Sequence, residues 1–236
     1  MNATSEPTVA LIHAGTASMA PAVEAFSEVF PQARLWHVLD DRLVVDADAA
    51  GGLTEPLRRR MCTLIEYAVA NGADAVQLAC SMYGPAADDP VTDGSGRPVP
   101  VLASDRAMFE AAARAGAHRV LVVASLTSAA KDTQTRLRAF LDAHGVGAPV
   151  STVVVEGAAA AASAGDRGLL ARLLADAVLA ELRPGDVVAL AQYSLAPVRT
   201  PLADALAAHD VSVLSPPHDA AAALGVTLIE RAGAAS

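Results

Sequence analysis

DAVQLACSMYGP at residues 74–85 and DVVALAQYSLAP at residues 186–197 are two versions of one phrase. Each begins with Asp, continues as an apolar run of the kind found in buried parallel strands, and ends with Pro. They differ in chemistry where the first has Cys80 and the second has Gln192. Repetition of a strand and the turn that follows it predicts an internal duplication.

The spacing between the two phrases recurs elsewhere in the chain. Adding 112 carries the first phrase onto the second, and it also carries VLA at 101–103 onto VLS at 213–215. An offset of 111 carries Thr16 onto Thr127, and each of these residues comes just after the first strand of its half. A constant offset across separate strands favours a duplicated unit over two unrelated βαβ segments that happen to look alike.

Eight short runs rich in Val, Leu and Ala alternate with longer helical patterns, which predicts an α/β fold. The strands form two sets of four, so we expect two pseudo-symmetric lobes, each a four-stranded parallel sheet flanked by helices. Lobe 1 is expected at 1–105, with a C-terminal helix at 216–236 packing back on it, and lobe 2 at 106–215. The expected strands are 8–14, 33–39, 74–80, 99–104, 119–125, 151–157, 186–192 and 211–216.

Composition excludes several classes of function. The 236 residues are 53% hydrophobic and only 3% aromatic, with a formal net charge of -9, which disfavours nucleic acid and anionic membranes as partners. No apolar run approaches the ~20 residues of a membrane span, and the N-terminus lacks a signal-peptide pattern. Two cysteines and no Cys/His cluster with zinc spacing argue against a disulfide scaffold and a metal site. We therefore expect a cytoplasmic protein that could form a homo-oligomer.

Small polar residues follow the strands at their carboxyl ends, where open parallel sheets bind their ligands. If the lobes face each other, these residues converge on one cleft, which is then the expected active site. Hydroxyl groups next to helix N-termini suit a carboxylate. The candidate substrate contacts are Thr16, Ser81, Met82, Tyr83, Ser125, Thr127, Ser128, Gln192, Tyr193 and Ser194.

Four stretches carry a resemblance to a known family. They are IHAGTASMAP near the start, GADAVQLACS around Cys80, LVVASLTSAAKDTQTRL at 121–137, and the second-lobe phrase. Together they resemble the Asp/Glu/hydantoin racemase superfamily over nearly the whole chain. That family includes amino-acid and hydantoin racemases, maleate isomerase and arylmalonate decarboxylase.

The resemblance implies proton transfer at a carbon next to a carboxylate, without a cofactor. In that family two cysteines, one from each lobe, act on opposite faces of the carbon. Here the first corresponds to Cys80 and the second to Gln192, followed by Tyr193 and Ser194 where racemases usually have Thr and His. Because an amide does not titrate near neutral pH, the sequence predicts chemistry with one catalytic cysteine, as in a one-base isomerase or a decarboxylase-type lyase.

Two other readings stay open. A racemase could use a second base that is not a cysteine, for which His13 and His218 are the candidates in the sequence. A small-molecule binding protein could have kept the lobes and lost the chemistry. Cys62 lies in a helical pattern and is expected to be structural. The substrate itself is expected to be a small carboxylate with a modest apolar substituent.

Overall fold

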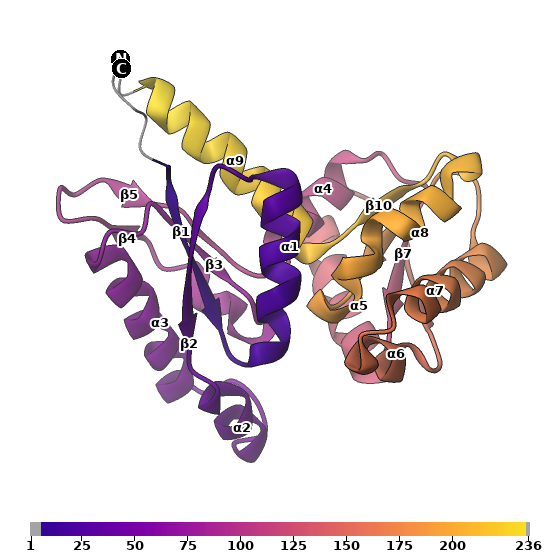
Figure 1. The fold of residues 1–236 in the computed structure, drawn as a ribbon, viewed down its shortest axis with the longest axis horizontal. Coiled ribbons are helices and arrows are strands. Elements are labelled where there is room, and N and C mark those ends of the chain that lie inside the picture. Colours follow the sequence, from indigo (N-terminus) through magenta and orange to yellow (C-terminus); the bar gives the residue numbers. More distant parts are fainter. Residues whose placement is uncertain (1–5, 235–236) are drawn as a thin grey trace. The chain divides into compact units, whose positions relative to one another are not determined.

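The computed structural model describes residues 6–234, so the end of the expected last helix, at 235–236, lies outside the described part (Figure 1). The chain divides into two compact units. Lobe 1 comprises the residues up to Ala107 together with those from Ala220 onward, and lobe 2 comprises Met108–Asp219. Each lobe contains its own parallel sheet and its own core.

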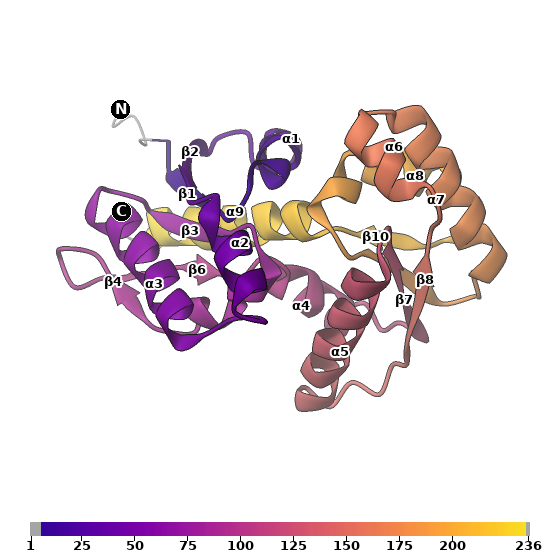
Figure 2. The same ribbon diagram turned by 90° about the horizontal axis from the view of Figure 1, so that it is seen from below.

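The sheet of lobe 1 has four parallel strands in the order β2-β1-β3-β6. Their bounds are β1 Thr8–His13, β2 Arg34–Leu39, β3 Ala75–Leu78 and β6 Val101–Leu102. Between and after them lie η1 Thr16–Ser18, α1 Met19–Val29, α2 Arg42–Ala49, α3 Glu55–Ala70, η2 Ser81–Ala87 and α9 Pro216–Ala234. Figure 2 shows α3 on one face of this sheet and α1 on the other.

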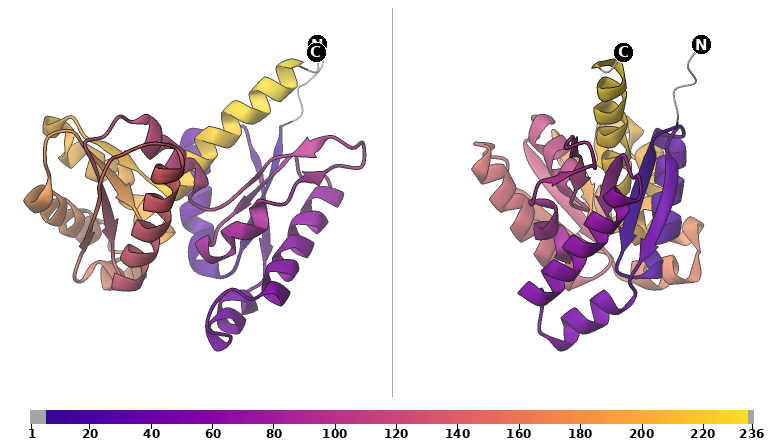
Figure 3. Two further views of the ribbon diagram at one scale, coloured as in Figure 1. Left: turned by 180° about the vertical axis from the view of Figure 1, so that it is seen from behind. Right: turned by 90° about the vertical axis from the view of Figure 1, so that its left-hand side faces the viewer.

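The sheet of lobe 2 repeats this plan, with four parallel strands in the order β8-β7-β9-β10. Their bounds are β7 Arg119–Ala124, β8 Val150–Val154, β9 Asp186–Leu190 and β10 Ser212–Leu214. The helices are α4 Arg106–Arg114, α5 Thr127–Ala143, α6 Ala158–Ala164, α7 Arg167–Glu181, η3 Tyr193–Val198, α8 Arg199–Ala205 and η4 Ala207–His209 (Figure 3). Two separate four-stranded sheets confirm the predicted fold class.

The hydrogen-bond register supports the duplication residue by residue. Val76 pairs with Val101 in lobe 1, and adding 112 to both numbers gives the Val188–Val213 pair of lobe 2. The central strands agree as well, because the pair formed by Val9 and Ala75 in lobe 1 has its counterpart in Val120 and Val187. A shared strand order and a shared register are therefore encoded twice in one chain.

Side-chain alternation divides each sheet into two packed faces. In lobe 1, Ala10, Ile12 and Ala14 of the β1 segment face a core completed by α3. In lobe 2, one face of β7 packs with α6, α7 and α8, and the other packs with α4 and α5. Burial on both faces explains why the strands are continuously apolar in sequence rather than alternating.

Two local features differ from the expectation. The run expected as one strand at 99–104 divides into β5 (Pro98–Val99) and the short β6. Strand β5 pairs antiparallel with β4 (Val91–Thr92) in a hairpin that the apolar pattern did not predict. The hairpin turn is organised by Asp93, whose carboxylate accepts hydrogen bonds from the backbone N–H groups of Ser95 and Arg97.

Helix α9 belongs mainly to lobe 1. A Cβ atom added at Gly225 would lie 3.3 Å from the ring of Phe30, so the helix backbone approaches the end of α1 closely. Arg231 donates a hydrogen bond to the Pro98 carbonyl at 2.7 Å. Within residues 6–234, no helix has the length and apolar character needed to cross a membrane.

Candidate active site at the carboxyl edges of the two sheets

The residues that distinguish the two phrases occupy equivalent places at the carboxyl edges of the sheets. In lobe 1 the N–H of Ala79 donates to the Ile12 carbonyl at 2.9 Å, and Cys80 follows. In lobe 2 the N–H of Ala191 donates to the Val123 carbonyl at 2.9 Å, and Gln192 follows. In each lobe, the residue that follows the strand therefore lies at the carboxyl edge of the sheet, where parallel sheets bind ligands.

The backbone conformations at the two positions match closely. Cys80 has φ -138° and ψ 119°, and Gln192 has φ -139° and ψ 146°. Both precede a short 3₁₀ helix, and the carbonyl oxygen of each accepts a hydrogen bond from the N–H three residues later, that of Tyr83 or Leu195. A thiol and an amide are therefore held on the same local scaffold.

Cys80 lies half-buried at its edge and contacts the α3-side core of lobe 1. Ser81, the next residue, is also half-buried, and the side chain of Met82 is exposed. Both begin η2, as the sequence predicted for the loop after this strand. A partly exposed thiol at the end of a parallel strand is accessible to a ligand, whereas a core cysteine is not.

Tyr83 does not lie at the rim of a binding site, which corrects one of the predicted substrate contacts. Its side chain is fully buried, and its hydroxyl donates to the Leu43 carbonyl of α2 at 2.7 Å. Burial raises the pKa of the phenol, and the neighbouring Cys80 raises it further. Its lobe 2 counterpart is Leu195, which is also fully buried. The offset of 112 pairs Tyr83 with Leu195 in the sequence. An apolar residue at the equivalent position was the sequence signal that Tyr83 belongs to the core.

Gln192 is held by a residue on the neighbouring strand end. Its Oε1 atom accepts hydrogen bonds from the backbone N–H of Ser125 at 2.9 Å and from the Ser125 hydroxyl at 3.0 Å. Ser125 is itself buried, whereas Gln192 is only half-buried. Both residues had been predicted to contact the substrate, but the contact between them was not predicted.

The remaining predicted contacts lie at the same edges with different exposure. Thr16 begins η1 in lobe 1, and Thr127 begins α5 in lobe 2; both side chains are exposed, as is Ser128. Tyr193 and Ser194 begin η3 and are half-buried. The edge of each lobe therefore carries hydroxyl groups beside a helix start, an arrangement suited to an anionic group.

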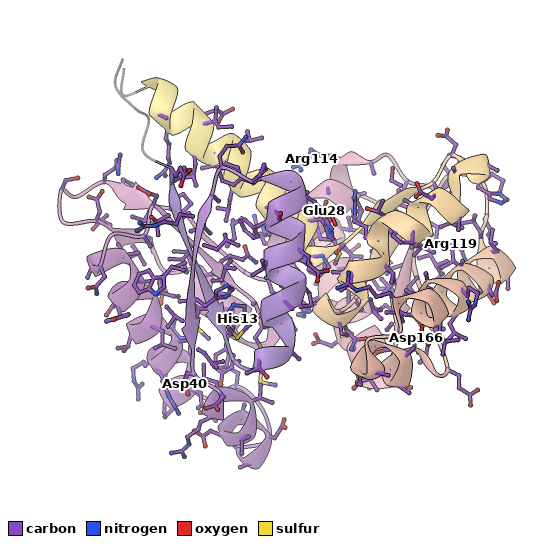
Figure 4. All side chains as sticks on the ribbon, viewed as in Figure 1. His13, Glu28, Asp40, Arg114, Arg119 and Asp166 are labelled. Carbon is purple, nitrogen blue, oxygen red and sulfur yellow. The ribbon has the colours of Figure 1, made fainter. Side chains whose placement is uncertain are left out.

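His13 occupies the end of β1 but points away from the face that carries Cys80. It lies between Ile12 and Ala14, whose side chains belong to the Cys80 face, and strand residues alternate between faces. Figure 4 labels His13 at the end of the lobe 1 sheet. Direct partnership between His13 and Cys80 as two bases on one carbon is therefore not supported.

The ring of His13 is engaged at both nitrogens. Nδ1 lies 2.7 Å from the Ser18 hydroxyl, and Nε2 lies 2.9 Å from Nδ1 of His37. Burial, reinforced by the neighbouring His37, lowers the pKa of His13 to about 4. His37 is half-buried, and burial lowers its pKa too.

His218 follows β10 at the carboxyl edge of lobe 2. Its side chain is buried, and Nδ1 lies 3.0 Å from the Ser215 hydroxyl. The backbone N–H of Ser215 donates to Asp219 at 2.8 Å. Burial raises the pKa of Asp219 to about 6, against the lowering effect of that N–H. This cluster caps the start of α9 and also places an imidazole at the edge that carries Gln192.

Arginine side chains near the lobe 1 edge are held by acidic residues. Arg60 of α3 donates to Asp40, just after β2, at 2.6 Å and to Asp46 of α2 at 2.7 Å. Figure 4 shows Asp40 at the same end of the sheet as His13. The Asp40 carboxylate is therefore already paired with a guanidinium. Within the described residues, no group of three or more His, Cys, Asp or Glu side chains could hold a metal ion.

Comparison with known proteins gives matches at the level of structure only. No protein-family model matches this chain, and no curated protein matches it in sequence. Among solved structures, glutamate racemase isoform RacE1 from Bacillus anthracis superposes with a TM-score of 0.65 at 13% identity, over 96% of this chain and 83% of that one. Allantoin racemase from Klebsiella pneumoniae has a TM-score of 0.65 at 17% identity, over 96% and 89%.

A third similar structure is an arylmalonate decarboxylase, with a TM-score of 0.58 at 16% identity, over 90% of this chain and 89% of that one. These matches cover almost the whole chain, so they concern both lobes and not one common βαβ unit. The chain therefore has the fold of the Asp/Glu/hydantoin racemase superfamily, which confirms the resemblance noted in its sequence at the level of the fold.

Proposed function

We propose that this protein is an enzyme that transfers a proton at a carbon next to a carboxylate, with Cys80 as its single catalytic cysteine and without a cofactor. The observation that carries the proposal is the equivalence of Cys80 and Gln192. Two edge positions share one backbone scaffold, and only the first carries a group that can take or give a proton near neutral pH. The reaction classes that fit are a one-base isomerisation and a decarboxylation followed by protonation.

The substrate proposed is a small carboxylate with an apolar substituent. Large apolar side chains are exposed at or shortly after the strand ends of both lobes, where solvent exposure costs free energy unless a ligand covers them. They are Leu39 (41% exposed), Met82 (36%), Leu126 (49%) and Val154 (43%). Hydroxyl groups of Thr16 and Thr127 at the same edges supply donors for the carboxylate.

The experiment is proton–deuterium exchange in deuterium oxide, followed by NMR, over amino acids, hydroxy acids, substituted malonates and maleate. Wild type is expected to label or protonate at least one of them from a single face. Cys80→Ala should lose at least the hundredfold to ten-thousandfold that general acid–base catalysis supplies. Cys62→Ala is the matched control and should keep full activity. Turnover that survives in Cys80→Ala would overturn the proposal.

A second candidate function is a racemase in which His218 replaces the second cysteine. The observation that favours it is the buried imidazole after β10, hydrogen-bonded to Ser215. Its signature in the same assay is label that enters both enantiomers at similar rates. His218→Asn should then abolish racemisation while one-faced exchange by Cys80 continues.

A further inference from the structure

The orientation of the Gln192 amide is determined by its partner. The backbone N–H of Ser125 can only donate, so the Gln192 atom 2.9 Å from it must be the oxygen. The Ser125 hydroxyl reaches the same oxygen at 3.0 Å. The two N–H groups on Nε2 therefore point away from Ser125, and they have no partner among the residues that the structure describes.

The exchange of Cys for Gln is matched by a second exchange beside it. The offset of 111 that relates β1 to β7 pairs Ser125 with Ala14, which is buried in the apolar cluster that Cys80 contacts. Lobe 1 thus has an alanine beside a thiol, and lobe 2 has a serine beside an amide. A thiol tolerates apolar neighbours, whereas an amide oxygen at a partly buried site needs donors. Simple loss of the second cysteine would not explain why lobe 2 also has the Ser125 hydroxyl that orients the Gln192 amide.

Ser125 and Gln192 are also held rigidly with respect to each other. Strands β7 and β9 are neighbours in the sheet, and their ladder runs to the pair Val123–Leu190, two residues before each of the two positions. Ser125 is 9% exposed, so its hydroxyl is fixed by packing. A donor whose position is set by a sheet loses little freedom when it binds an acceptor.

We propose that Gln192 is an oriented hydrogen-bond donor for the carboxylate of the substrate, and that Ser125 is the residue that positions it. This inference rests on the proposed function and adds a role for the position where the second cysteine is replaced. The Nε2 group can only donate, so the substrate group that meets it is an acceptor. An ammonium group cannot occupy that place, which disfavours amino acids that would present one there.

The test uses the side-chain NH₂ signals of Gln192 in the ¹⁵N-labelled full chain, titrated with acetate, phenylacetate and methylmalonate at constant ionic strength. Saturable shifts of the Gln192 pair are expected with these probes. Methylammonium and sodium chloride are expected to give none. Gln134 is the internal control, because its Nε2 already donates to the Val150 carbonyl at 2.8 Å. Absence of a shift with every carboxylate, or an equal shift with methylammonium, would overturn the inference.

Variants of the two residues distinguish hydrogen-bond donation by Gln192 from the positioning of Gln192 by Ser125. Gln192→Leu should weaken carboxylate binding roughly tenfold or more, the scale of a hydrogen bond to a charged group. Gln192→Glu keeps the contacts with Ser125 but presents an acceptor, so it should weaken binding further. Ser125→Ala should raise KM more than it lowers kcat and broaden the Gln192 signals, and Ser125→Thr should restore both. Equal behaviour of Ser125→Ala and Ser125→Thr would remove the positioning role.

The titration also separates this inference from the proposed function. Cys80→Ala should keep the Gln192 shifts, because carboxylate binding to the amide needs no proton transfer. If wild type exchanges protons through Cys80 but Gln192 does not respond to any probe, the inference fails alone. If Gln192 responds and no substrate in the panel is exchanged, the proposed function fails alone.

Discussion

Arg119 and Asp186 form a buried ion pair at the amino edge of the lobe 2 sheet, and Nε of Arg119 donates to Asp186 at 3.0 Å. The equivalent acid in lobe 1 is Asp74, which accepts a hydrogen bond from the backbone N–H of Thr8 at 2.8 Å. One acid thus holds together the same two strands in both lobes. The amino edges of the two sheets keep this shared acid, whereas at the carboxyl edges Cys80 of lobe 1 is replaced by Gln192 in lobe 2.

Gln192→Cys should change the stereochemical outcome of the reaction. The backbone conformation at this position resembles that of Cys80, so the new thiol would lie at the end of its strand as Cys80 does. A substrate that wild type labels on one face should then racemise, with label in both enantiomers by chiral chromatography and NMR. Gln192→Ser, which adds no comparable acid, is the control. One-faced labelling by both variants would show that the second position does not reach the reacting carbon.

Cys80 should react with iodoacetamide faster than Cys62 at neutral pH. Burial raises the pKa of the Cys62 thiol, and the hydrogen bond to Asp89 also raises it, against the lowering effect of Arg58. The thiolate is the reactive species, so a raised pKa slows alkylation. Peptide mass spectrometry over time gives both rates in one sample. Faster labelling of Cys62 would argue against an activated thiol at Cys80 and for a binding protein that has lost the chemistry.

Thr127→Val should lower proton exchange without changing stability. The substitution removes only the hydroxyl at the exposed start of α5, and loss of one preorganised donor to a developing oxyanion typically costs roughly a hundredfold in rate. Thr135→Val is the matched control, since Thr135 lies on the same helix and donates to the Lys131 carbonyl. If the two variants retain equal activity on the true substrate, Thr127 does not belong to the site.

Tyr83→Phe should destabilise lobe 1 by about 1–3 kcal/mol, because the buried Leu43 carbonyl loses its donor. Urea unfolding followed by circular dichroism measures the change. Tyr67→Phe is the control, since Tyr67 is 53% exposed and lies outside the η2 segment. A role of Tyr83 in substrate contact would instead appear as lost activity at unchanged stability.

His13 and Asp219 should give opposite contributions to stability in mild acid. The pKa of His13 is lowered to about 4, so between roughly 6.5 and 4 the unfolded chain binds a proton that the folded chain does not, and acid destabilises. The pKa of Asp219 is raised to about 6, so between roughly 6 and 3.8 the folded chain binds the proton, and acid stabilises.

The two effects oppose each other between about pH 6 and 4, so wild type should show a shallow pH dependence there. Asp219→Asn should steepen the loss of stability on acidification, and His13→Asn should reverse its sign, each by up to about 1.4 kcal/mol per pH unit. Urea midpoints from pH 7 to 4 provide the measurement, with His209→Asn as a surface control. Parallel curves for all variants would contradict the assigned pKa shifts.

The fold could be predicted because its signals are periodic and repeated. Eight apolar runs predicted the eight parallel strands, and the constant offset predicted that the sheets would share one order and register. The β4–β5 hairpin was missed because its strands are only two residues long, too short to give a periodic pattern, and its turn is organised by the Asp93 side chain.

For the candidate site residues, the sequence predicted their places along the strands but not the orientations of their side chains. The phrase at the strand ends located Cys80 and Gln192, since strand ends are a property of the chain order. Which face a side chain takes depends on packing across the sheet, so the sequence did not separate His13 from the Cys80 face. The Ser125–Gln192 contact joins residues 67 apart in sequence, and the buried role of Tyr83 depends on a carbonyl 40 residues away.

Because of their order along the chain, the two lobes can complete folding at different stages of synthesis. Lobe 2 is one uninterrupted stretch, Met108–Asp219, and can complete its contacts as soon as it emerges, because domains generally fold as units during synthesis. Lobe 1 can be completed only after the segment from Ala220 onward has been synthesised, because that segment contains Gly225, which packs against Phe30. Synthesis interrupted before Ala220 would therefore leave lobe 2 with all of its segments, and lobe 1 without the helix that packs against Phe30.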